Sequence, residues 1–153
     1  MNIQQIADEI NVDVANLNRI TGSETIGYAY PGGFLTDLMY DGAKNHSTIK
    51  YARGITSTYN FGLPTDWYNW QPTCSFLDDR AVSLANQFIG TFTMTDTLLY
   101  IWGHSFECDL HENGWARLEN LLSTIYNGRG AGITRATNGE VYNYITQNRY
   151  FAG

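Results

Sequence analysis

The sequence predicts an α/β fold in which mostly parallel strands are joined by crossover helices. Helix-like and strand-like segments alternate along the chain of 153 residues, a pattern typical of parallel sheets and (β/α) barrels. The most apolar strand candidate, residues 98–102, is a near-continuous run, as expected where both faces of a strand are covered. The length favours a single domain over residues 1–153 that is large enough to bury a core.

The first half of the chain opens with a predicted amphipathic helix. Its apolar residues recur at helical spacing, and Gly22 follows them as at a helix end. The predicted elements of this half are a helix at 2–20, a strand at 25–30, a helix at 34–45, a strand at 50–55 and a loop at 56–79. So long an aromatic loop is more often functional than idle.

The second half continues the alternation. Its predicted elements are a helix at 79–89, the strand at 98–102, a helix at 114–126, a strand at 133–136 and a helix at 139–148. Asn138 is the expected N-cap of the last helix because its side chain can accept a hydrogen bond from the first turn.

Composition and charge exclude several classes of protein. The formal net charge is −6 and the nine Lys and Arg residues are scattered, which argues against nucleic-acid binding. No window is long and apolar enough for a membrane span, and the start has no signal-peptide pattern, so we expect a cytoplasmic protein. Cys74 and Cys108 are expected to be structural free thiols.

His104 is the first candidate for acid–base chemistry. It follows the strand at 98–102, and ligands of parallel α/β folds meet the carboxyl ends of strands. An imidazole titrates near neutral pH, and Glu107 and Asp109 follow closely enough to orient it. A histidine that only hydrogen-bonds to backbone at a strand end, with carboxylates that are only solvated, fits the sequence equally well.

Two further motifs give weaker signals. The turn Pro31-Gly32-Gly33 offers N–H groups that could face an oxyanion, although such a motif taken alone more often serves only as a turn into a helix. His104, Asp109 and His111 could hold a metal ion, but none of the three histidines has a usual metal-ligand spacing.

Five stretches occur in the order and at about the spacing of the carboxyl-terminal half of polysaccharide deacetylases. They are IGYAYPGG, YARGITSTYNFGLPTDWYNWQPTC, LLYIWGHSFE, NGWARLENLLSTI and ATNGEVYNYI. This family consists of metal-dependent carbohydrate esterases that remove N- or O-acetyl groups from sugar polymers. The resemblance covers about residues 3–144 and implies a partial (β/α) barrel whose first strands are missing here.

The resemblance also implies roles for single residues. His104 matches the general acid that protonates the leaving amine or alkoxide. Gly32 stands where a backbone N–H faces the oxyanion, and Arg53 could replace an orienting arginine that many members carry at the position of Ala29. The implied substrate-binding residues are Tyr30, Pro31, Trp67, Trp70 and Glu107.

Two family motifs have no counterpart in this sequence. In the family an Asp-Asp pair supplies the general base and one metal ligand, and a His-x-x-x-His segment supplies two more ligands. Asp78-Asp79 opens a helix in the downstream half and does not match that pair. A full-length member would hold a divalent metal such as zinc, but this chain alone is expected to hold no metal and to show little or no activity.

The implied partner is an acetylated sugar polymer or oligosaccharide. The open sheet edge of a half barrel would also favour pairing with a second copy or a partner half. The alternative function is a non-catalytic carbohydrate-binding or assembly module, in which the aromatic loop at residues 59–70 stacks on sugar rings.

Overall fold

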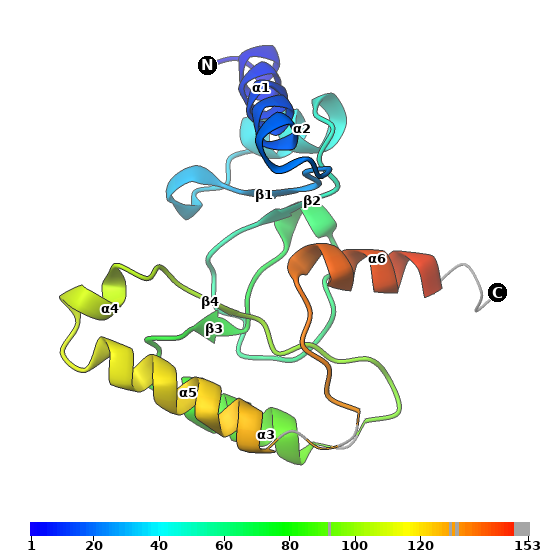
Figure 1. Cartoon of the computed structure of the whole chain (residues 1–153). Helices are drawn as coiled ribbons and strands as arrows, with labels where there is room; N and C mark the ends of the chain where they lie inside the picture. Colours follow the sequence, from blue (N-terminus) through cyan, green and yellow to red (C-terminus); the bar gives the residue numbers. More distant parts are fainter. Residues whose placement is uncertain (92, 129, 131, 149–153) are drawn as a thin grey trace. The chain divides into compact units, whose positions relative to one another are not determined.

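The computed structural model describes residues 1–91, 93–128, 130 and 132–148, and it divides the chain into two compact units (Figure 1). Unit 1 comprises Met1–Gly54, Pro64–Trp70 and Arg135–Gly153, and unit 2 comprises Ile55–Leu63 and Gln71–Thr134. Each unit holds one pair of short parallel strands with helices. The mixed α/β class is therefore confirmed, whereas the described residues form no closed barrel.

Unit 1 is built on the parallel strands β1 (Gly27–Ala29) and β2 (Tyr51–Arg53). Gly27 lies opposite Tyr51 and Ala29 opposite Arg53. The other elements of this unit are α1 (Ile3–Thr21), η1 (Pro31–Gly33), α2 (Asp37–His46), η2 (Trp67–Asn69) and α6 (Asn138–Asn148). Helices α1 and α2 pack together, and their apolar faces meet residues of the strands in a core of Ile10, Tyr30, Ala43, Ile49 and Ala52.

Helix α1 has sequence signals at both of its ends, which is why it could be predicted. The Asn2 side chain accepts a hydrogen bond from the Gln5 N–H, and the Gln5 side chain accepts one from the Asn2 N–H, so both ends of a capping box are made. At the other end Gly22 adopts φ 68°, a left-handed conformation that glycine tolerates best. The predicted helix at 2–20 is confirmed with its cap.

Unit 2 is built on the parallel strands β3 (Cys74–Ser75) and β4 (Ile101–Trp102). Its helices are α3 (Ala81–Gly90), α4 (Glu107–Leu110) and α5 (Gly114–Gly128), of which α3 and α5 lie side by side (Figure 1). The buried core contains Cys74, Phe76, Ala81, Leu84, Ala85, Cys108 and Leu121. Both cysteines are free and buried, as predicted, and burial raises the pKa of the Cys74 thiol to about 11.

Three predictions about local structure were wrong. Residues 133–136 form no strand, because only Ile133 is half-buried and the segment pairs with no described strand. Strand β3 lies inside the predicted loop at 56–79. Thr137, not Asn138, caps α6, since its hydroxyl accepts from the Glu140 N–H while its own N–H donates to the Glu140 carboxylate. Within the described ranges, no helix is long and apolar enough to cross a membrane.

Candidate functional site

The carboxyl ends of β3 and β4 lie at one edge of the strand pair in unit 2, because the two strands run parallel. The pairing sets Cys74 opposite Ile101 and Ser75 opposite Trp102. Gly103 and His104 leave β4 at this edge, and residues 76–80 leave β3 there. Polar side chains that follow both strands therefore belong to the same end of the sheet.

His104 is paired with Glu107 at the end of β4. The His104 Nδ1 atom lies 3.4 Å from Glu107 Oε1, and the His104 backbone N–H donates to Glu107 Oε2 at 2.8 Å. The two side chains are 51% and 24% exposed, so the imidazole is open to solvent and the carboxylate is mostly covered. Since Nδ1 faces the carboxylate, Nε2 is the ring nitrogen left for proton exchange with a ligand.

Two aromatic rings border the His104 imidazole. The ring of Trp102 meets it edge-on at 5.5 Å between centroids, and the ring of Phe106 lies at 5.1 Å with a tilt of 31°. Phe106 is 57% exposed, so it presents an apolar surface beside the histidine. These contacts and the Glu107 pair together restrict the orientation of the imidazole.

Gly103 positions His104 by allowing a close approach of the backbone to the core. Its φ of 157° is a conformation that L side chains rarely adopt. A Cβ atom at this position would collide with the ring of Phe76, which is buried. The Phe76 N–H in turn donates to the Trp102 carbonyl at 2.9 Å, so the turn after β3 and the end of β4 are held together.

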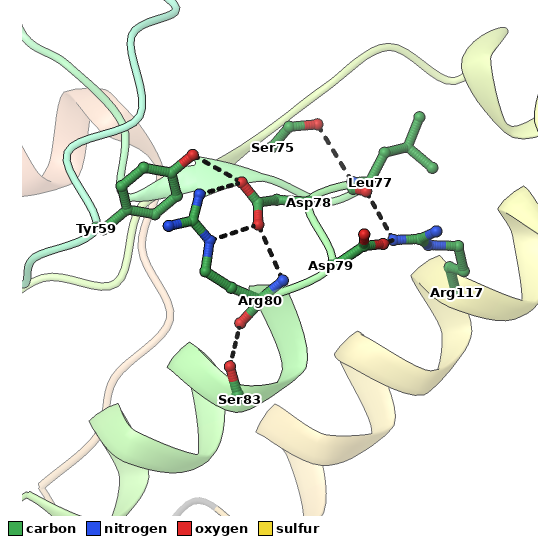
Figure 2. Close-up of polar contacts among 8 residues, drawn as sticks. All are labelled: Tyr59, Ser75, Leu77, Asp78, Asp79, Arg80, Ser83 and Arg117. Atoms are coloured by element: carbon green, nitrogen blue, oxygen red, sulfur yellow. Dashed lines mark hydrogen bonds and ion pairs between the residues drawn. The ribbon is translucent and has the colours of Figure 1, made fainter.

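A polar cluster around Asp78 follows β3, as Figure 2 shows. The Asp78 carboxylate accepts hydrogen bonds from the Arg80 N–H at 2.9 Å, the Arg80 Nε at 3.2 Å and the Tyr59 hydroxyl at 2.9 Å. The Arg80 guanidinium lies 3.4 Å above the centroid of the Tyr59 ring, a cation–π contact. Arg117 binds Asp79 and the Leu77 carbonyl, both at 2.7 Å.

This Asp78 cluster was missed by sequence reasoning. The sequence placed Asp78-Asp79 only at a helix start, and Tyr59 lies 19 positions away from Asp78. Tyr59 itself adopts φ 55°, which is rare for a residue with a side chain. No local sequence pattern predicts these tertiary contacts of Tyr59 with Asp78 and Arg80, which we call the clamp.

Replacing Asp78 by asparagine is expected to lower the free energy of unfolding of the protein in a pH-dependent way. Burial alone would raise the pKa of Asp78, but hydrogen bonds from Arg80 and Tyr59 outweigh it and hold the pKa below its usual value. A depressed folded-state pKa gives stability that is present above the unfolded pKa and is lost as the pH falls through the folded one. The difference between wild type and Asp78→Asn should be largest near neutral pH and shrink below about pH 4.

Urea denaturation at several pH values measures this difference. The Tyr59→Phe variant removes one donor and keeps the carboxylate, so it should lose a smaller part of the same stability. A gap between wild type and Asp78→Asn that stays constant from neutral to strongly acidic pH would contradict the assignment of the clamp.

The remaining predicted site residues belong to unit 1. Gly32 lies in η1 with φ 64° and is exposed. Arg53 stands next to Ala29 in the parallel register, and its Nη1 donates to the Gly54 carbonyl at 3.0 Å. Pro31 is exposed, whereas Tyr30 is buried and its hydroxyl donates to the Tyr68 carbonyl at 2.8 Å. Burial raises the pKa of Tyr30.

The two tryptophans predicted to bind substrate form an aromatic cluster in unit 1. Trp67 and Trp70 meet edge-to-face at 5.1 Å, Trp67 contacts Tyr142 at 4.9 Å, and Trp70 contacts Tyr51 at 5.5 Å. Trp70 is only 2% exposed, so almost none of its ring is available for stacking on a sugar. Trp67 is half-buried and keeps part of its surface open.

The aromatic residues of the loop in unit 2 are also engaged with protein groups. Arg80 covers one face of the Tyr59 ring, and Phe61 packs edge-on against Phe88 at 5.2 Å. The loop at residues 59–70 therefore presents no continuous row of open rings within either unit.

The described residues do not form a metal centre. Among them, no group of three His, Cys, Asp or Glu side chains could hold a metal ion, and this includes the set of His104, Asp109 and His111. Asp109 instead accepts a hydrogen bond from the Trp115 indole at 2.7 Å.

No family model, curated protein or solved structure matches the chain.

Proposed function

We propose that the chain is part of a polysaccharide deacetylase-like domain in which His104 donates a proton to the leaving group when an acetyl group is removed from a sugar. The observation that carries this proposal is the pairing of His104 with Glu107 at the carboxyl end of β4. The five stretches that resemble the family support the same assignment. In this proposal the two parallel strand pairs are portions of a barrel of the deacetylase type.

The chemistry required of His104 follows from the bond that breaks. When the C–N bond of an acetamide or the C–O bond of an acetyl ester is cleaved, the departing nitrogen or oxygen needs a proton. The Nε2–H of His104 would supply it, while Glu107 stabilises positive charge on the ring and fixes its orientation through Nδ1. Phe106 offers an apolar surface beside the His104 ring for the acetyl methyl group.

Deacetylases of this family use a divalent metal, which activates water and polarises the acetyl carbonyl. The described residues do not fit such an ion, because no set of three ligands lies together among them. The role proposed for this chain is therefore confined to two residues of unit 2, with His104 as the acid and Glu107 as its partner. A second copy or a partner half would supply the remaining groups.

Nuclear magnetic resonance with a triacetylated chitotriose tests the proposal. The signals of the Trp102 indole and the His104 ring should shift with the acetylated trimer, and should shift less with cellotriose, which lacks acetamido groups. His104→Ala should weaken the acetyl-dependent response of Trp102. The matched control is His46→Ala, because His46 is similarly exposed and pairs with Asp41 at 3.5 Å on a different element.

Two outcomes would contradict the proposal. The first is an identical response of Trp102 to both trimers. The second is rapid release of acetate by the chain alone with added zinc or cobalt, abolished by His104→Ala, because the reaction would then not depend on groups outside this chain. The expected turnover of the chain alone is little or none.

A further inference from the structure

A pocket of about 620 Å³ lies in unit 1 between the β1–β2 strand pair and the start of α6. Volumes of about 300–1,000 Å³ are typical of small-molecule sites. Residues 24–29 line one side, Tyr51 and Arg53 of β2 contribute further lining, and residues 137–140 with Asn143 line the α6 side. Among the residues given a role above, only Arg53 lines this pocket.

The hydroxyl of Tyr51 marks the pocket as more than a gap in the packing. Tyr51 is 8% exposed, and among the described residues its hydroxyl has no hydrogen-bond partner. The ring lies over Gly27, where any side chain would collide with it, and a methyl group at Gly139 would be 3.8 Å from the hydroxyl. Both glycines line the pocket, so the unpaired hydroxyl is directed into it. A hydroxyl that faces an open pocket can both donate a hydrogen bond to a ligand and accept one from it.

The charges around the pocket select against an anionic ligand. Glu140 already occupies the N-terminus of α6, where its carboxylate accepts from the Thr137 N–H at 2.7 Å and the Thr137 hydroxyl at 2.8 Å. These hydrogen bonds lower the pKa of Glu140, so it is charged at neutral pH. Glu24 adds a second carboxylate, against the single cation of Arg53. An anion would face two carboxylates at a helix end that is already satisfied.

We propose that this pocket binds a neutral, multiply hydroxylated ligand of one or two sugar units, with the Tyr51 hydroxyl as a central hydrogen-bonding group. Carboxylates, amides and hydroxyls around the rim offer both acceptors and donors, which is what sugar hydroxyls require. The tyrosine rings of the wall provide apolar surface for the faces of the sugar. The site lies wholly in unit 1, so it does not depend on the chemistry proposed for His104.

Titration with cellobiose followed by amide NMR spectra tests the proposal. Cellobiose is neutral and carries no acetyl group, so it does not probe the deacetylase role. Signals of Gly27, Tyr51 and Gly139 should shift, with a dissociation constant on the order of millimolar. Tyr51→Phe should weaken binding about threefold to tenfold, which corresponds to one net hydrogen bond. Asn143→Ala, on the exposed side of α6, should weaken it similarly.

Two control variants distinguish binding in this pocket from effects elsewhere in the protein and from the role proposed for His104. Tyr144→Phe removes a hydroxyl from an exposed residue of the same helix outside the pocket and should leave binding unchanged. His104→Ala should also bind cellobiose as the wild type does, whatever its effect on the acetylated trimer. The proposal is overturned if cellobiose at about 20 mM shifts none of these signals. It is equally overturned if inorganic phosphate shifts them instead, or if Tyr51→Phe and Asn143→Ala, both folded, bind with wild-type affinity.

Discussion

Replacing Gly103 by alanine is expected to destabilise the protein by about 2–4 kcal/mol, because overpacking of the core and an unfavourable φ act together. The added methyl group would collide with the buried ring of Phe76, and the backbone at this position has φ 157°. Relief of the collision requires either the Phe76 ring or the end of β4 to move. A movement of the backbone should also disturb the pairing of His104 with Glu107, since His104 follows Gly103 directly and Glu107 lies three residues further on.

Urea denaturation followed by circular dichroism measures the loss. Gly90→Ala is the matched control, because Gly90 ends α3 in the same unit and a methyl group there meets no atom within 4 Å. That variant should be neutral or slightly stabilising. Equal stabilities of Gly103→Ala and Gly90→Ala would show that the chain at the end of β4 does not approach Phe76 as described.

The Trp70→Ala variant is expected to lose about 3–5 kcal/mol, the usual cost of removing a large aromatic side chain from a core. Trp70 is 2% exposed and contacts Tyr51 and Trp67. Trp67→Ala should cost less, since Trp67 is half-buried. The comparison separates a packing role from a sugar-binding role for the two tryptophans.

The same denaturation experiment, paired with a sugar titration, decides between these roles. If Trp70→Ala unfolds at nearly the wild-type urea concentration but no longer responds to oligosaccharide, Trp70 is a ligand contact and not a core residue. If the stability falls as expected, Trp70 is a core residue of unit 1. Its ring is then not an exposed surface on which a sugar stacks.

Long helices and the parallel strand pairing could be predicted from the sequence because their signals are local. Helix α1 combines helical apolar spacing with a capping box and a terminal glycine, and each of these features acts within a few residues. The parallel pairing follows from the alternation of helix and strand. His104 and Glu107 lie only three positions apart, so their pairing could also be expected.

Short strands and contacts between distant residues could not be predicted from local sequence patterns. Strand β3 has only two residues, and it forms because β4 lies alongside, so nothing in its own sequence distinguishes it from loop. Residues 133–136 have strand-like composition but no partner strand among the described residues. The contacts of Tyr59 with Asp78 and Arg80 depend on the path of the loop. The surroundings of the Tyr51 hydroxyl depend on Gly27 and Gly139, which are distant from Tyr51 in the sequence.

The capping of α6 illustrates a choice between two adjacent candidates. Asn138 and Thr137 are both good N-cap residues. Glu140 stands three positions after Thr137, so a capping box is possible only if Thr137 is the cap. That spacing was present in the sequence and would have corrected the prediction.

The tautomer of the His104 ring is the most direct test of the central claim, that Glu107 holds this histidine with Nε2 available for proton transfer. Long-range ¹H–¹⁵N NMR spectra at about pH 9, where histidine side chains are generally neutral, distinguish the two forms. We expect the proton on Nδ1 in the wild type, because Nδ1 lies 3.4 Å from the carboxylate, and a shift toward the Nε2–H form in Glu107→Ala. A wild-type ring that already carries its proton on Nε2, unchanged by Glu107→Ala, would contradict the account.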